Sequence, residues 1–361
     1  MAIEGTVKPG FELVRAVFEE NFASRGEVGA ACAAVVESEL VVDLWGGQAD
    51  PKTPRAWTED TVVNVYSTTK GMASMAILHA ASHGLFRFDD MVSEHWPEFA
   101  AAGKGAITIR QLLSHQAGLS AIDQKLDATA LADPDQMAAA LAAQAPAWAP
   151  GTRHGYHGIS LGWYESELIR RTDPKSRTIG RYFQEEIADP LGLDFWIGLP
   201  QTVSEMRIAR AQADWYRVKM LANISKMPRN FVKGFLNPRS LTARTFGNPA
   251  MLGKPSRYND PAMRKLELPA SNGHGTARAI ATAYGELAAG GARLGITDEV
   301  MGEVAKAAAD PSGGRMDLVL TTDTRFSLGY CKPWDGFNFG SPSSFGTPGA
   351  GGSLGFADPS R

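Results

Sequence analysis

Apolar residues near the start of the chain follow first a helical and then a strand-like pattern. They recur at helical spacing over residues 11–24 until Gly26, which predicts an amphipathic helix. Two valine-rich runs, GAACAAVVES and ELVVDLWGG, come next and are separated by a polar turn at residues 37–39. Short apolar runs joined by such a turn are typical of an antiparallel hairpin. We therefore expect a sheet to begin directly after the first helix.

A second apolar segment predicts a strand that leads into a helix. The run TVVNVY at 61–66 is rich in β-branched residues and ends at Ser67. The stretch TTKGMASMAILHAASHG follows and predicts a helix that Gly84 terminates. This helix is apolar nearly all round, which indicates that it is buried, with Ser67 at its N-terminus.

The middle of the chain is mostly helical in pattern. Helices are predicted over 134–144, 160–171 and 178–188. Residues 201–270 have weak periodicity with many prolines, glycines and aromatic residues, so we expect loops and short helices that line the mouth of a pocket and select the substrate.

The last third of the chain predicts a return to the first sheet. A helix is predicted over 276–291, and RMDLVLTT at 315–322 and RFSLGYCKPW at 325–334 have strand composition. We expect these strands to rejoin the early hairpin. The predicted fold is an α/β protein of the α+β type, with an antiparallel sheet flanked by helices. Residues 1–84 and 271–361 would form the sheet domain and residues 85–270 a large helical insertion.

Composition and charge narrow the class of partner. The chain has 361 residues, 44% of them hydrophobic and 21% charged, and a net charge of −3. No run of lysine and arginine is present, so nothing indicates nucleic acid or a membrane as partner, and a small-molecule ligand is expected. The N-terminal stretch lacks the apolar core of a signal peptide, which favours a cytoplasmic location. The two cysteines, Cys32 and Cys331, have neither disulfide-framework nor zinc-site spacing, so no metal is expected.

Ser67 and Lys70 are the first candidate catalytic residues. On a helix, residues three apart lie on one face about 5 to 6 Å apart at Cβ, so both side chains can point to the same place. Burial would lower the pKa of the lysine and leave a neutral amine able to take the serine proton. The alternative is that Ser67 only caps the helix and Lys70 reaches solvent, since one such pair is about what chance produces in this composition.

Two other serines stand in a G-x-S-x-G pattern, which is typical of the nucleophile in α/β-hydrolases. That fold needs a strand before the serine and a histidine after it. Ser353 follows the last histidine, His274, and no strand pattern precedes Ser160. We therefore disfavour both serines as nucleophiles.

With five further segments, the Ser67 motif resembles the serine β-lactamase and penicillin-binding-protein-like superfamily, and most of all the family VIII carboxylesterases. The resemblance covers nearly the whole chain. The matching segments are LLSHQAGL at 112–119, WAPGTRHGYHG at 148–158, DPLGL at 189–193, SNGHGTARAIATAYGELAAGG at 271–291 and FGTPGAGGSLGFADP at 345–359.

The resemblance implies a role for each matching residue. Ser67 would be the nucleophile, Lys70 its general base and Tyr156 the second proton-transfer group. The backbone N–H groups of Ser67 and Ala350 would form the oxyanion hole. Gly349 and Gly351 would let the backbone approach the substrate, and His157 would line the acyl pocket or hydrogen-bond to a loop.

Departures from the family pattern favour neutral esters over β-lactams. Gly158 stands where lactamases keep an asparagine, and Thr347 stands where they place a cation. We expect a serine esterase that hydrolyses short-chain carboxylic esters without a cofactor, with weak β-lactamase activity as a side reaction. A β-lactamase, an acyltransferase or an amidase with the same mechanism remains an alternative, and so does a non-catalytic ligand-binding protein.

The end of the chain also departs from the family. Relatives usually continue through another strand after the segment at 345–359. We therefore expect the last strand to be covered by further chain or by a second subunit, which makes a homo-oligomer possible.

Overall fold

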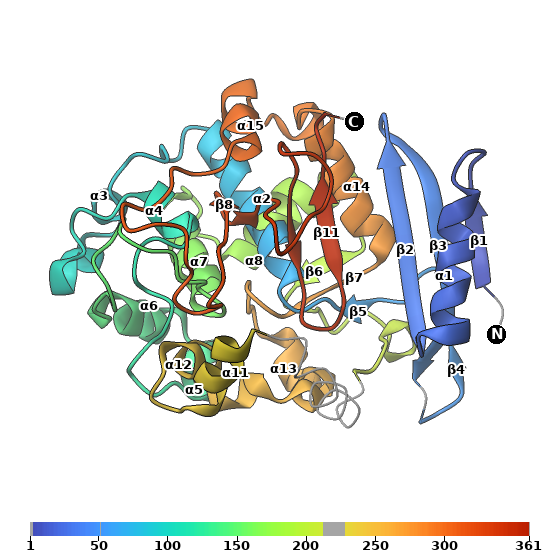
Figure 1. Ribbon diagram of the computed structural model, residues 1–361, viewed down its shortest axis with the longest axis horizontal. Coiled ribbons are helices and arrows are strands. Elements are labelled where there is room, and N and C mark those ends of the chain that lie inside the picture. The colour runs from blue at the N-terminus through green and yellow to red at the C-terminus, as the bar shows by residue number, and fades with distance from the viewer. Residues whose placement is uncertain (1–2, 51, 212–227, 361) are drawn as a thin grey trace.

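The N-terminal part of the chain forms an antiparallel sheet with one helix packed on it (Figure 1). The computed structural model describes residues 3–50, 52–211 and 228–360. In this sheet β3 lies between β1 and β2, and β4 pairs with β3. Helix α1 (Glu12–Ser24) buries Phe18 against the sheet. The bounds of the strands are β1 Ile3–Val7, β2 Gly29–Val36, β3 Glu39–Asp50 and β4 Arg55–Ala56.

These elements confirm the predicted helix and hairpin and add two strands, β1 and β4. In the hairpin Gly29 lies opposite Gly47 and Val36 opposite Glu39. Strand β1 was not predicted, because its five residues, IEGTV, have too little periodicity to be recognised without the partner strand β3.

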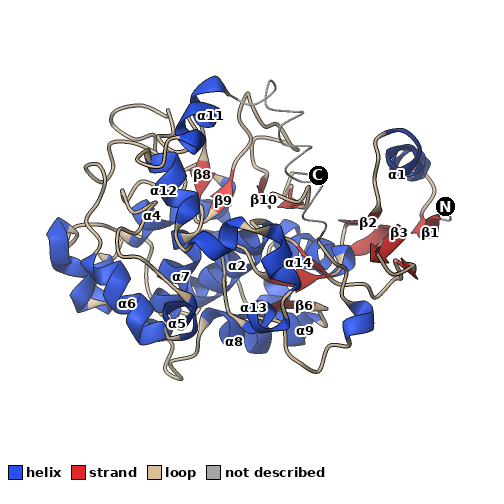
Figure 2. Ribbon diagram, turned by 90° about the horizontal axis from the view of Figure 1, so that it is seen from below, coloured by secondary structure: helices blue, strands red, loops and turns tan. Residues whose placement is uncertain are grey.

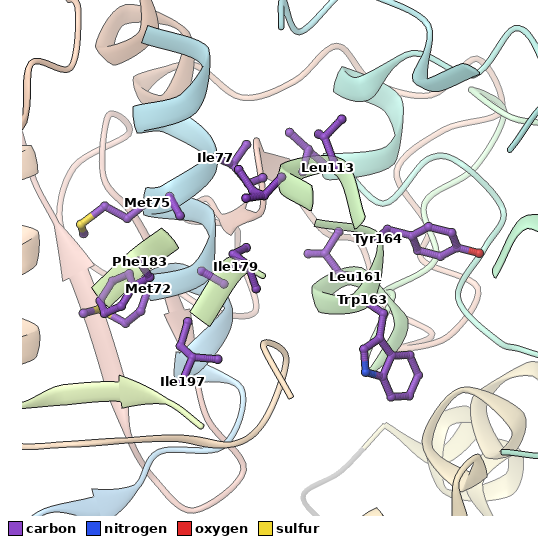
Figure 3. Close-up of a cluster of buried hydrophobic side chains, with 14 of the residues drawn as sticks. Met72, Met75, Ile77, Leu113, Leu161, Trp163, Tyr164, Ile179, Phe183 and Ile197 are labelled. Atoms are coloured by element: carbon purple, nitrogen blue, oxygen red, sulfur yellow. The ribbon is translucent and has the colours of Figure 1, made fainter. Parts of the chain in front are cut away.

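Helix α2 (Thr68–Ser82) runs through the centre of the molecule. Every residue from Thr68 to Ala80 is buried, as its apolar composition predicted. Met72, Met75 and Ile77 pack against side chains of α7 (Ser160–Thr172) and α8 (Ile179–Phe183), as Figure 3 shows. A helix held on all sides in this way positions the side chains at its N-terminus rigidly.

The middle of the chain is helical, as predicted, and its helices lie to the left of α2 and below it in Figure 2. The predicted helix over 178–188 is α8, which continues through a π-helical turn at Gln184–Ala188 into α9. The remaining bounds are α3 Val92–His95, α4 Ile109–Leu113, α5 Ala128–Ala132, α6 Pro134–Ala143 and α9 Asp189–Leu191.

Residues 201–211 and 228–270 form loops and short helices, as expected, while residues 212–227 of this predicted region lie outside the described part of the chain. The helices here are α11 Arg229–Leu236, α12 Leu241–Gly247 and α13 Pro261–Lys265. No helix in the described residues has the length and apolarity needed to cross a bilayer.

A small antiparallel sheet joins three distant segments beside the N-terminus of α2. Strand β7 (Gly273–Gly275) lies between β5 (Val63–Asn64) and β6 (Phe195–Ile197). The predicted strand over 61–66 is therefore only two residues long, and Tyr66 adds a single bridge to Asn272.

The C-terminal strands form their own sheet, in the order β11-β10-β9-β8. The prediction that they rejoin the early hairpin is wrong for the described residues. Helix α14 packs against both β2 and β11, and a cleft of about 1030 Å³ separates the two strands. The bounds are α14 Ala277–Ala288, α15 Asp298–Ala305, β8 Phe326–Ser327, β9 Tyr330–Cys331, β10 Phe345–Pro348 and β11 Leu354–Ala357.

The predicted strand over 315–322 is also absent. The Asp317 carboxylate accepts hydrogen bonds from the N–H groups of Val319 and Leu320, which holds this run in a turn. The general fold class, antiparallel sheets flanked by helices, is confirmed. The division into a sheet domain and an insertion stays a prediction.

Candidate active site

Ser67 lies directly before the first residue of α2, and its hydroxyl is not used to cap that helix. The preceding residue, Tyr66, has a φ of +46°, a left-handed conformation that residues other than glycine rarely adopt. The Ser67 side chain accepts no capping hydrogen bond. The hydroxyl is partly exposed and available for chemistry, so the interpretation of Ser67 as a simple helix cap is wrong.

Lys70 is fully buried and bonds three oxygen atoms. Its Nζ lies 3.2 Å from Ser67 Oγ, 2.6 Å from the carbonyl oxygen of Gly158 and 2.9 Å from that of Ala270. A neutral amine has two N–H donors and one lone pair. The two carbonyls can accept both donors, so the lone pair is left for the Ser67 hydroxyl.

The electrostatics of the site favour this neutral form. Burial lowers the pKa of Lys70 to about 7, because an ammonium group loses its hydration here, while the charges of Glu165 and Cys331 act in the opposite direction. The alternative that Lys70 reaches solvent is wrong. Near neutral pH a large share of Lys70 is therefore a free base beside a hydroxyl.

Tyr156 completes the cluster. Its hydroxyl is hydrogen-bonded to Ser67, and Lys70 Nζ lies 5.1 Å from the centre of its ring. Burial raises the pKa of Tyr156 well above its usual value, so the phenol keeps its proton and can donate it. Its backbone N–H donates to Asp317 Oδ2 at 2.9 Å, and its ring stacks on Phe326. The structure thus brings all three predicted catalytic side chains together.

His157 points into the protein. Its Nε2 accepts a 3.1 Å hydrogen bond from the N–H of Leu119, and its Nδ1 lies 3.2 Å from Nδ1 of His115. The side chain is fully buried, which lowers its pKa to about 3. The suggested contact with the acyl group stays a prediction, and this geometry favours the alternative, a hydrogen bond to a loop.

The turn after β10 lies against the start of α2. Ser353 Oγ donates to the carbonyl oxygen of Val65 at 2.7 Å and accepts from Thr68 Oγ1 at 3.0 Å. A Cβ at Gly349 would stand 2.2 Å from Ser353 Oγ, so only glycine fits this junction. Within the described residues, the N–H groups of Ser67 and Ala350 donate to no acceptor. Both remain free for an oxyanion, as the prediction requires.

Gly351 is tightly placed as well, since a Cβ there would lie 2.9 Å from the ring of Tyr66.

The structure shows what lies next to the two residues that depart from the lactamase pattern. A Cβ on Gly158 would lie 2.5 Å from the Phe246 ring, so α12 occupies the space of a longer side chain. Thr347 is buried, and its Oγ1 faces Gly71 in α2.

The two other candidate serines have structural roles. Ser160 is buried and donates to the carbonyl oxygen of Leu119 at 2.7 Å, and Ser353 holds the turn described above. His274 is buried with its Nδ1 3.0 Å from the carbonyl oxygen of Asn272. None of these groups forms a nucleophile with a base.

Sequence reasoning missed a buried carboxyl group behind Lys70. Glu165 of α7 is fully buried and accepts a 2.8 Å hydrogen bond from Ser74, which lies one turn beyond Lys70 on α2. Burial raises the pKa of Glu165 to about 8. A signal was available, because Glu165 has Trp163, Tyr164 and Leu168 close by in the helix predicted over 160–171.

One group of side chains in the described residues has metal-ligand spacing, namely Asp90, Glu94 and His95 at α3. Asp90 Oδ2 already accepts a hydrogen bond from the N–H of Arg87 and pairs with His95. We assign no metal or cofactor to this protein.

Comparison with known proteins identifies the family. Residues 14–361 match the family model described as Beta-lactamase. The chain belongs to the β-lactamase family. The resemblance seen in the sequence motifs is therefore confirmed over nearly the whole chain.

Individual members of the β-lactamase family show where the chain lies within it. It is 31% identical over 360 residues to Esterase/beta-lactamase LipL of Mycobacterium tuberculosis, covering 98% of this chain and 80% of LipL. A crystallised family VIII carboxylesterase is 35% identical with a TM-score of 0.85, covering 100% of this chain and 91% of that one. A penicillin-binding protein homologue from Caulobacter crescentus is 37% identical with the same TM-score of 0.85 and the same coverage, 100% and 91%.

Proposed function

We propose that this protein is a serine hydrolase that cleaves short-chain carboxylic esters through an acyl-enzyme on Ser67. The observation that carries the proposal is the environment of Lys70, whose Nζ lies within hydrogen-bond distance of two carbonyl oxygens and of the Ser67 hydroxyl. In the neutral amine the carbonyls take both N–H donors, so the lone pair is left for Ser67. The similarity to a family VIII carboxylesterase and to an esterase/β-lactamase supports the choice of an ester.

Acylation begins when Lys70 takes the proton of Ser67 and the oxygen attacks the ester carbonyl. The N–H groups of Ser67 and Ala350 stabilise the negative charge that forms on the carbonyl oxygen. Tyr156 then donates its proton to the departing alkoxide, and Lys70 returns a proton to Tyr156.

Deacylation runs in the reverse sense with water as the nucleophile. Neutral Lys70 removes a proton from the water, directly or through Tyr156, which passes its own proton to Lys70 as it takes the water proton. The hydroxide attacks the acyl carbonyl, and Lys70 returns the proton by the same route to the oxygen of Ser67 as it leaves. Gly349 and Gly351 allow the backbone to approach the acyl group, and the substrate-binding role of His157 stays part of the proposal.

The preference for esters over β-lactams follows from the missing polar anchors. Gly158 offers no side-chain amide to a substrate acylamino group, and Thr347 brings no positive charge to a carboxylate. A β-lactamase, an acyltransferase or an amidase would use the same three side chains. In a non-catalytic ligand-binding protein these side chains would take part in no reaction. The two-domain division, a cytoplasmic location and self-association also belong to the proposal.

The test compares three reagents on one protein: p-nitrophenyl butyrate, nitrocefin and a phosphonate ester probe, with the labelled peptide located by mass spectrometry. We expect ester turnover faster than nitrocefin turnover, and a phosphonate adduct on Ser67. Ser67→Ala should lose both turnover and label, while Ser160→Ala, the matched control, keeps them. An adduct on another serine, or none at all, would overturn the proposal.

A further inference from the structure

Helix α11 presents large apolar side chains to solvent. Leu236 is 73% exposed and its neighbour Phe235 is 44% exposed. Both line a hollow of about 460 Å³ between α11, α12 and residues 122–125. Two adjacent exposed side chains of this size on one helix end are unusual for a surface that meets only water.

The same part of the chain is strongly basic. Residues 228–259 contain six lysines and arginines and no aspartate or glutamate, in a protein whose net charge is −3. Arg244 pairs with Asp123, and Arg257 lies near Asp260. The other four have no ion pair in the described residues; they are Arg229, Lys233, Arg239 and Lys254. Because the net charge of the whole chain is negative, its composition did not reveal this local excess of positive charge.

Aromatic contacts connect this surface to the active site. The Phe235 ring lies 6.2 Å from that of Phe231, and the Phe231 ring 6.5 Å from that of Phe246. Phe246 in turn lies 6.5 Å from the ring of Tyr156. The exposed end of α11 is therefore joined to the catalytic tyrosine by packed apolar rings.

We propose that the basic apolar surface formed by Arg229, Lys233, Phe235, Leu236 and Arg239 docks on an anionic lipid surface. Exposed apolar side chains in a segment with cations that are unpaired within the described residues fit the boundary between acyl chains and anionic headgroups, where each group meets its preferred surroundings. Nucleic acid offers no apolar layer for Leu236. Lys233 lies two residues before Phe235 and Arg239 three residues after Leu236, and cations spread along the segment in this way match a diffuse negative surface better than one acidic peptide.

A consequence for the substrate rests on the proposed function. An ester that carries an apolar chain in such a lipid surface would reach Ser67 along the aromatic side of the site. Docking is independent of catalysis, so the two parts of the inference can fail separately.

Docking is tested by co-sedimentation of the full chain with phosphatidylcholine vesicles, with and without phosphatidylglycerol, at low and high salt. We expect at least tenfold tighter binding to the anionic vesicles, weakened by salt. The double variant Phe235→Ser/Leu236→Ser and the double variant Lys233→Gln/Arg239→Gln should each lose most of this binding.

The matched control lies on α1, where Leu13 is 74% exposed and Val17 40%. Leu13→Ser/Val17→Ser should bind vesicles like the unchanged protein. Absence of binding to anionic vesicles, equal binding to both vesicle types, or an equal loss in the control variant would each overturn the docking surface. Binding to an acidic peptide or to DNA with none to vesicles would do the same.

Catalysis gives the second readout. Turnover of soluble p-nitrophenyl butyrate should be unchanged in Lys233→Gln/Arg239→Gln, which leaves the aromatic contacts intact, while hydrolysis of p-nitrophenyl palmitate held in anionic vesicles falls at least fivefold. Equal rates for the vesicle-held ester in variant and unchanged protein would contradict the substrate class. If the soluble ester is not hydrolysed at all, the proposed function fails, and sedimentation still decides the docking.

Discussion

Lys70 donates a 2.6 Å hydrogen bond to the main-chain oxygen of Gly158, two residues after Tyr156. This contact ties the buried helix α2 to the loop that carries the tyrosine. It also uses one of the donors of Lys70, as the carbonyl oxygen of Ala270 uses another. The amine of Lys70 is thus oriented by the backbone of two segments that are far from it in sequence.

Replacing Lys70 should remove the general base while the fold persists. Lys70→Ala is expected to lower kcat for a soluble ester by about 10²- to 10⁴-fold, the usual contribution of such a group. The matched control is Lys104, which is also fully buried and donates to the carbonyl oxygens of Ala101, Ala142 and Gln144. Lys104→Ala should lower the melting temperature and leave kcat of the folded protein unchanged. Equal kcat losses in both variants would refute the role of Lys70.

Tyr156→Phe should affect esters according to their leaving groups. An alkoxide needs a proton to leave, so we expect kcat for an ethyl ester to fall about 10²-fold or more. A p-nitrophenolate leaves unaided, so p-nitrophenyl butyrate should lose much less in acylation. Parallel steady-state and burst measurements on both esters check this difference. A uniform loss would show that Tyr156 only positions Ser67.

Gly349→Ala should disturb the oxyanion hole. Its Cβ would lie 2.2 Å from Ser353 Oγ and 2.3 Å from the carbonyl oxygen of Val65, which forces the turn at Ala350 away from Ser67. The expected loss in kcat is about 10²- to 10³-fold, as for removal of one oxyanion donor. Gly302→Ala, where no atom lies within 4 Å of the new Cβ, serves as control and should retain full kcat.

The ring of Phe246 should limit activity on β-lactams. Gly158→Asn alone places a side chain against Phe246 and is expected to lower ester turnover. Adding Phe246→Ala makes room for the amide, and the ratio of nitrocefin to ester turnover should then rise about tenfold over the unchanged protein. Kinetics on the single and double variants measure this ratio. An unchanged ratio in the double variant would mean that other contacts exclude β-lactams.

The sequence predicted the site best where its residues are close together along the chain. Ser67 and Lys70 lie three residues apart on one helix, so their proximity follows from helical geometry. Burial of α2 followed in the same way from its apolar composition. The partners of Lys70 were not predictable, because Gly158 and Ala270 contribute backbone oxygens, which every residue type carries.

The errors have a common physical origin in long-range contacts. The run at 315–322 has strand composition, but the Asp317 carboxylate binds nearby N–H groups and that of Tyr156, which stabilises a turn instead. The C-terminal strands do not join the hairpin, because α14 and a cleft lie between β2 and β11. Likewise, nothing in the local pattern showed that Phe246 covers Gly158.

Glu165 offers a way to assign the titration of Lys70. Burial raises the pKa of Glu165 to about 8, so its carboxyl is mostly neutral over the acid limb and a neutral replacement should leave the midpoint of about 7 in place. In Glu165→Gln we therefore expect the kcat/KM profile to keep both its acid limb and its plateau. Loss of the limb would show that Glu165, and not Lys70, is the group that titrates.

The pH dependence of kcat/KM for p-nitrophenyl butyrate tests the central claim most directly. The amine of Lys70 accepts a proton only in its neutral form, and burial lowers its pKa to about 7. Activity should therefore be low at pH 5.5, rise tenfold for each pH unit below the midpoint, and level off above an apparent pKa of about 7. A midpoint near 10, the value of a hydrated lysine, or a rate independent of pH between 5.5 and 9 would contradict the account.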